Sequence, residues 1–167
     1  VTFVMHGLFD KNLDFWESDE GGSHYHTAWR TALSTENQRI IVMPHGRGIQ
    51  NYLGNAVEEF PIILEQLEEN WNIDTTHISI FTWSKGARNV LQFMVNKHLP
   101  VETIALCQPI IIEDDTRLYS LLLRMKSMYP DLKWYIRHGM NDTVAPIYLS
   151  RKLDEYLKMM SFEVDYK

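Results

Sequence analysis

The chain has 167 residues, of which 45% are hydrophobic and 23% are charged, and its formal net charge is −6. This composition excludes a disordered, collagen-like or disulfide-stapled chain, and it contains only one cysteine. No apolar run approaches the roughly 18 residues that span a bilayer, and an acidic chain repels phosphate backbones. We therefore expect neither membrane spans nor nucleic-acid partners, and a single domain over residues 1–167.

Six short runs rich in valine and isoleucine predict strands. Most of them are almost continuously apolar, which is typical of strands covered on both faces. In chain order the predicted strands are Val1–Met5, Arg39–Met43, His77–Phe81, Thr103–Cys107, Lys133–Arg137 and Phe162–Tyr166.

Between these runs, apolar residues recur every three or four positions and predict helices. The predicted helices are Ala28–Ser34, Ala56–Trp71, Lys85–His98, Arg117–Met128 and Pro146–Met160. Pro61 fits only near the first turn of its helix. The alternation predicts the α/β class, with a mostly parallel sheet flanked by helices on both faces. Ligands of such sheets bind at the carboxyl ends of the strands, so each strand-to-helix junction is a candidate site.

The third junction carries a candidate nucleophile, Ser84. It lies between an apolar strand and an amphipathic helix, and Gly86 follows two residues later. This arrangement fits a nucleophile elbow, although the usual first glycine of the motif is replaced by Thr82. The N–H of Lys85, at the amino end of the helix, would stabilise an oxyanion there. The simpler interpretation is that Ser84 is only a helix cap.

The fifth junction carries a candidate acid, Asp142, in the string from His138 to Pro146. A carboxylate just past a strand end is well placed to orient an imidazole. An Asx turn or a helix cap is the structural alternative. Asp114 and Asp115, after the fourth strand, are the fallback for this acid.

Two His-Gly turns follow the first and second strands, at His6-Gly7-Leu8 and at His45-Gly46. The first would expose the N–H of Leu8 as an oxyanion donor, and the second competes with it for the same role. Either could also be a plain turn.

Taken together and in this order, these motifs resemble those of α/β-hydrolase-fold serine hydrolases over essentially the whole chain. Residues 44–59 add a likeness to esterase and prolyl-oligopeptidase-like members. The resemblance implies Ser84 as nucleophile, Asp142 as acid, and the backbone N–H groups of Leu8 and Lys85 as the oxyanion hole. It implies no metal or organic cofactor and a small-molecule ester as substrate. Trp83, beside the nucleophile, would line the substrate pocket.

The resemblance departs from the family in its histidine, which should follow the last strand. No histidine follows Asp142 in this chain. We therefore expect the chain to be shortened at both ends, with the catalytic imidazole beyond Lys167. His138 is expected to shape its turn, and His24 or His26 is the substitute base.

Several other residues have a structural interpretation as well as a functional one. His24 and His26 near an acidic cluster could bind a metal, but they read better as part of a solvated loop. His77 and His98 are expected to be structural, and Cys107 to be a packing residue.

Three functions are compatible with the sequence. The first is a serine hydrolase that cleaves a carboxylic ester through an acyl-enzyme on Ser84, with short peptides as neighbouring substrates. The second is a non-catalytic hydrolase-like binding domain without a complete triad. The third, a flavodoxin-like ligand domain, would require a glycine-rich phosphate loop, which the sequence lacks.

Overall fold

A computed structural model describes residues 1–5, 40–42, 55–97 and 99–167. The described strands form one sheet in which every neighbouring pair is parallel, in the order β2-β1-β3-β4-β5-β6. The strands are β1 Thr2–Met5, β2 Ile41–Val42, β3 Ile78–Trp83, β4 Val101–Cys107, β5 Lys133–Arg137 and β6 Glu163–Tyr166.

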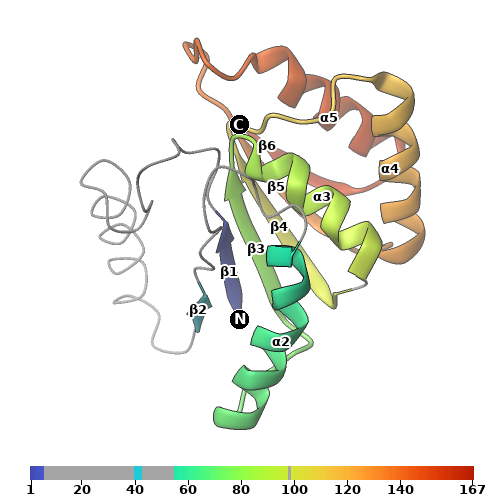
Figure 1. Ribbon diagram of the computed structural model, residues 1–167. Helices are drawn as coiled ribbons and strands as arrows, with labels where there is room; N and C mark the ends of the chain where they lie inside the picture. Colours follow the sequence, from blue (N-terminus) through green and yellow to red (C-terminus); the bar gives the residue numbers. More distant parts are fainter. Residues whose placement is uncertain (6–39, 43–54, 98) are drawn as a thin grey trace.

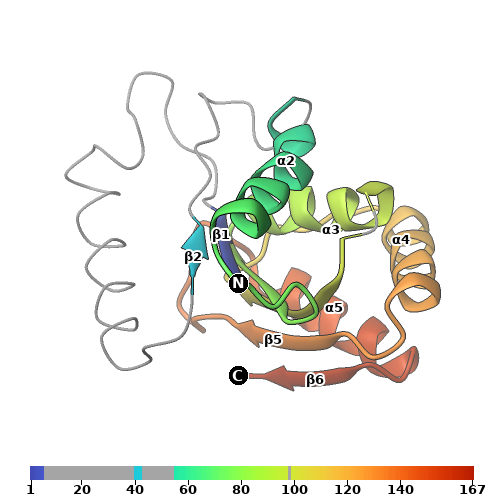
Figure 2. The same cartoon turned by 90° about the horizontal axis from the view of Figure 1, so that it is seen from below.

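Helices occupy the connections that the apolar periodicity predicts. They are α2 Asn55–Asn70, α3 Gly86–Lys97, α4 Asp115–Met128 and α5 Ile147–Met159. The helix predicted at Ala28–Ser34 lies outside the described residues. The predicted α/β class, a parallel sheet flanked by helices, is confirmed. The four described helices lie on one face of the sheet (Figures 1 and 2), so the helices predicted on the other face stay a prediction.

The core lies between the sheet and the four described helices (Figures 1 and 2). Strand register puts Phe3, Ile80 and Ile104 on one face of the sheet, and all three are buried. The ring of Phe60 in α2 lies 4.8 Å from the ring of Phe3 and 4.8 Å from that of Phe93 in α3. Truncating such a buried phenylalanine to alanine costs about 3–5 kcal/mol, so this aromatic row anchors two helices to the sheet.

The opposite face is less covered from β3 onward. Burial alternates along β3 and β5, and Tyr135 of β5 is 39% exposed, whereas every residue of β1 is buried. Figure 2 shows α2, α3, α4 and α5 on one side of the strands. The side chains of Trp83, Cys107 and Arg137 therefore lie on the less covered face, at the carboxyl ends of three adjacent strands.

The sequence predicted Pro61 near the first turn of its helix, and this prediction is wrong. The helix begins at Asn55, so Pro61 is its seventh residue and removes one bond from the helical ladder. The neighbouring Phe60 is fully buried against Phe3 and Phe93. This packing holds the turn and overrides the local preference.

Candidate active site

Ser84 occupies a strained turn between β3 and α3. Its φ is 52°, in the left-handed region, which costs a residue other than glycine roughly 1–2 kcal/mol. Its N–H donates to the carbonyl of Cys107 at 3.0 Å, and its own carbonyl accepts from Ala87 N at 3.2 Å and Ile110 N at 3.0 Å. These bonds hold the turn against the end of β4. A serine with this backbone, between a strand and a helix, has the geometry of a nucleophile elbow.

The residues after Ser84 are small and let the helix start at once. Gly86 and Ala87 are buried in the first turn of α3, whereas Ser84 is half-buried and the side chain of Lys85 is exposed. The amino end of a 12-residue helix, with its positive dipole, thus lies next to the serine. The oxyanion role expected of the Lys85 N–H stays a prediction.

Thr82 shows how the elbow accommodates the missing first glycine. Its side chain is fully buried on the face covered by helices, in register with Leu106 of β4. Its hydroxyl has no hydrogen-bond partner within the described part of the chain. A buried hydroxyl without a partner costs about 1–3 kcal/mol, so the elbow carries a polar penalty as well as backbone strain.

Asp142 lies in the loop between β5 and α5, and its carboxylate is fixed by that loop. Its Oδ1 accepts from Val144 N and Ala145 N, each at 2.8 Å, and its own N–H donates to Gly139 O at 3.2 Å. The bond from the Ala145 N–H is the largest cause that lowers the pKa of this carboxyl below its usual value. The Asx turn expected as the structural alternative is therefore present, and its hydrogen bonds favour the ionised form of Asp142.

The turn at Ser84 and the loop that holds Asp142 lie at the same edge of the sheet. That loop, residues 138–146 between β5 and α5, is called the acid loop below. Trp83, Cys107 and Arg137 end β3, β4 and β5 in register. Neighbouring strands are about 4.8 Å apart, so the residues that follow β3 and β5 are about 10 Å apart. Burial, and then the charge of Asp142, raise the pKa of the Cys107 thiol, which fits a packing residue rather than a nucleophile.

Gln108, which the sequence analysis overlooked, lies on this edge between the two loops. Its φ is 48°, its N–H donates to Arg137 O at 2.7 Å, and it is exposed. Its side-chain amide nitrogen lies 3.9 Å from the point that a Cβ on Gly139 would occupy. No sequence signal marks it, because glutamine has no preference for the left-handed region. Non-glycine residues in that region cluster at functional sites.

His138 follows β5 directly, and its side chain is fully buried. Its Nε2 lies 2.9 Å from Ala145 O and 3.6 Å from Asp142 Oδ2. The backbones of His138 and Ser84 are about two strand spacings (about 10 Å) apart, and the ring is bonded to the loop after β5. These contacts favour the predicted role of His138 in shaping its turn.

The fallback acids have other partners. Asp114 is the N-cap of α4, where Oδ1 accepts from Arg117 N at 2.9 Å, and Asp115 forms an ion pair with Lys152 of α5. Because both carboxylates are exposed and already paired, Asp142 is the better candidate for the acid.

Trp83 is half-buried at the end of β3, with its ring 6.2 Å from that of Phe81. Its place beside Ser84 keeps it a candidate for the substrate pocket. Other predicted residues lie outside the described ranges: Leu8, His24, His26, His45 and His98.

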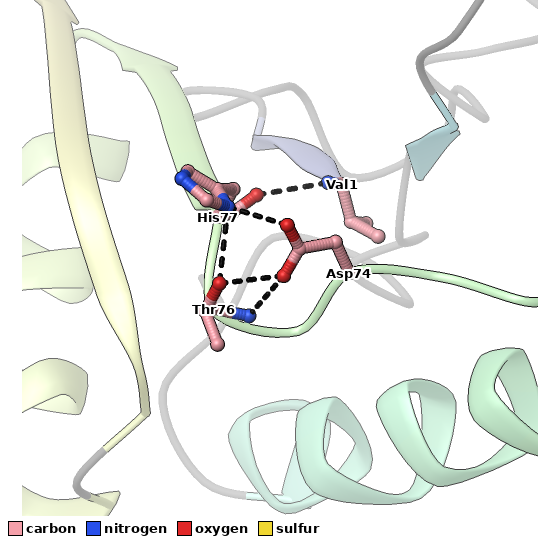
Figure 3. A network of polar contacts seen from close by, with 4 residues as sticks. All are labelled: Val1, Asp74, Thr76 and His77. Atoms are coloured by element: carbon pink, nitrogen blue, oxygen red, sulfur yellow. Dashed lines mark hydrogen bonds and ion pairs between the residues drawn. The ribbon is translucent and has the colours of Figure 1, made fainter.

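The opposite edge of the sheet holds a second acid–histidine pair (Figure 3). His77 Nδ1 lies 2.5 Å from Asp74 Oδ2, and Thr76 donates to Asp74 Oδ1 through both its N–H and its hydroxyl. A groove of about 1080 Å³ adjoins this network, lined in part by Trp71, Lys133 and Tyr135. It lies at the amino ends of the strands, far from the elbow.

Within the described ranges, no group of three or more histidine, cysteine or acidic side chains is placed to hold a metal ion. A search of the same residues finds no helix long and apolar enough to cross a membrane.

The sequence matches no family profile and no curated protein. Solved structures that share its architecture include the following two. One, described as a "putative carboxylesterase" from Lactobacillus plantarum WCFS1, has a TM-score of 0.60 and 11% identity, over 99% of this chain and 72% of that one. The other, LpqC, a poly(3-hydroxybutyrate) depolymerase from Bordetella parapertussis, has a TM-score of 0.60 and 15% identity, over 99% and 71%. At these identities the likeness establishes the fold, and the chain has the fold of an α/β-hydrolase.

Proposed function

We propose that this protein is a serine hydrolase that cleaves a carboxylic ester through an acyl-enzyme on Ser84. The observation that supports this most is the left-handed backbone of Ser84 between β3 and α3, with φ at 52°. Such strain in a residue other than glycine is retained where the surrounding structure enforces it, and the bonds to Cys107 and Ile110 do so here.

In the proposed reaction the hydroxyl oxygen of Ser84 attacks the ester carbonyl, and an imidazole accepts the hydroxyl proton. The C–O bond to the alcohol then breaks, and that alcohol takes the proton from the imidazolium. Water attacks the acyl-enzyme in the same manner and releases the acid. Asp142 stabilises the imidazolium, and the amino end of α3 stabilises the oxyanion, together with the N–H groups of Lys85 and Leu8.

The source of the imidazole stays a prediction. The N–H of His138 donates to Lys167 O at 3.0 Å, so β6 ends beside the first residue of the acid loop. Lys167 therefore lies beside the start of the loop that carries Asp142.

The second candidate function is a non-catalytic binding domain with the same fold. It is favoured by the two described histidines, His77 and His138. The first lies at the amino edge of the sheet, and the second is buried with Nε2 bonded to Ala145. Both rings are thus bonded to groups other than Ser84.

Hydrolysis of short-chain aryl esters by the full natural chain separates the two functions. Ser84→Ala should lower kcat by at least about 10³-fold, because the bond-forming oxygen is removed. Ser161→Ala is a matched control, since Ser161 also has a positive φ, 59°, but lies in the exposed turn before β6. Turnover retained by Ser84→Ala would refute the proposal. Absence of turnover from the natural chain would favour the binding domain.

A further inference from the structure

Two side chains of the acid loop, those of His138 and Asp142, form hydrogen bonds with the backbone of the same residue, Ala145. Its N–H donates to Asp142 Oδ1 at 2.8 Å, and its carbonyl lies 2.9 Å from His138 Nε2. Ala145 is 3% exposed, so water has little access to either bond. Breaking such a bond leaves a buried polar group unpaired.

His138 is fixed to the sheet as well as to the loop. It follows the last residue of β5, and its N–H donates to Lys167 O at 3.0 Å, which extends the ladder between β5 and β6. Because a carbonyl oxygen can only accept, Nε2 carries the ring proton. Nδ1 is buried and has no partner among the described residues, so the hydrogen bond to Ala145 is the one that the ring makes there.

Each oxygen of Asp142 has a distinct environment. Oδ1 accepts from two backbone N–H groups, those of Val144 and Ala145. Oδ2 lies 3.6 Å from His138 Nε2, which is beyond hydrogen-bond range. Oδ2 therefore has capacity to accept a hydrogen bond from an incoming imidazole, and its direction is set by the two bonds that Oδ1 makes.

We propose that His138 is a positioning residue for the acid of the proposed hydrolase. Through Ala145 it ties the Asp142 carboxylate to the carboxyl end of β5, so that Oδ2 keeps its direction toward the catalytic imidazole. This inference rests on the proposed function. His138 acts without touching the substrate, and its effect on the reaction is entirely through the placement of Asp142.

The kinetic test compares two substitutions of His138 in the full natural chain. His138→Leu keeps the bulk and removes the donor, whereas the side-chain amide of His138→Gln can still donate to Ala145 O. We expect His138→Leu to lower kcat about 10- to 100-fold with little change in KM, because a misplaced catalytic group costs this much. His138→Gln should recover most of the loss. His77→Leu, which removes the exposed histidine at the other edge, is the matched control and should change neither constant.

A second readout does not depend on activity, and so separates this inference from the proposed function. The Ala145 N–H is the largest cause that lowers the Asp142 pKa, so loosening the loop should raise that pKa, measured by carbon NMR of the carboxyl group. The rise should be larger in His138→Leu than in His138→Gln, because both variants lose the smaller coulombic effect of His138. Nitrogen NMR of the wild-type ring should show the proton on Nε2, which requires no variant to fold. A proton on Nδ1, or an Asp142 pKa and kcat that His138→Leu leaves unchanged, would overturn the role of His138 whether or not Ser84 is the nucleophile.

Discussion

The two edges of the sheet each carry an aspartate beside a histidine, but the surroundings of the two pairs differ. At the amino edge, the side chains of His77 and Asp74 are 67% and 59% exposed and bond to each other and to Thr76 (Figure 3). At the carboxyl edge, those of His138 and Asp142 are 0% and 8% exposed and bond mainly to the backbone. The edge with the buried pair, His138 and Asp142, is also where ligands of parallel sheets bind.

This difference shows that a close contact between an acid and a histidine does not by itself identify a catalytic pair. The shorter contact, 2.5 Å at the amino edge, joins residues three apart in sequence and caps the start of a strand. The longer contact, 3.6 Å, leaves an oxygen of Asp142 with capacity to bond. Solvent exposure of the side chains separates the two edges better than the contact distance does.

The largest effect on catalysis at the carboxyl edge should come from substituting the proposed acid, Asp142. We expect Asp142→Asn to lower kcat about 10³- to 10⁴-fold while the thermal melt stays cooperative, because the imidazole loses its orienting anion. Steady-state ester hydrolysis measures this loss. Asp114→Asn is the control, since that residue caps α4. A silent Asp142→Asn together with an inactive Asp114→Asn or Asp115→Asn would move the acid to the loop after β4.

Substitutions at the amino edge should change the stability of the fold and leave kcat unchanged. Hydrogen bonds, first from the Thr76 hydroxyl, lower the Asp74 pKa from 3.8 to about 2. The folded-state pKa is below the unfolded one, so ionised Asp74 stabilises the fold above about pH 4, and this contribution is lost as pH falls toward 2. Denaturant unfolding of wild type and Asp74→Asn should therefore differ most above pH 4 and converge toward pH 2. A difference that does not vary with pH, or a large loss of kcat in this variant, would contradict the contrast between the edges.

The smallest expected effect concerns the buried hydroxyl below the elbow. Thr82→Val keeps the shape and removes an oxygen that lacks a partner among the described residues, so it should be neutral or raise stability by up to about 1 kcal/mol. Thermal unfolding measures this change, and kcat should be unaffected. Destabilisation by more than about 1 kcal/mol would show that the hydroxyl makes a favourable bond.

Strands and helices could be predicted from the sequence because apolar periodicity and junction chemistry are local. The predicted bounds of β5 match those of the structure, and the ends of α4 differ by two residues or fewer. Pro61 could not be placed correctly, because the burial of Phe60 against Phe3 and Phe93 decides that turn. Long-range packing of this kind leaves no mark on the local pattern.

The candidate site was predictable where a motif encodes it and not elsewhere. Ser84 and Asp142 follow strands with recognisable turn residues, so their common edge follows from the parallel order. The positive φ of Gln108 and the bond between His138 and Ala145 depend on neighbouring strands and on a contact between residues seven apart in the chain. Neither has a residue-type signature.

Covalent labelling tests the central claim, that Ser84 is an activated nucleophile, most directly. A fluorophosphonate reacts quickly only with a serine whose hydroxyl is activated, and peptide mass spectrometry of the labelled natural chain locates the adduct. The proposed function predicts one adduct, on the peptide that contains Ser84, which disappears in Ser84→Ala and persists in Ser161→Ala. Labelling at another serine, or none on Ser84 in the folded natural chain, would contradict it.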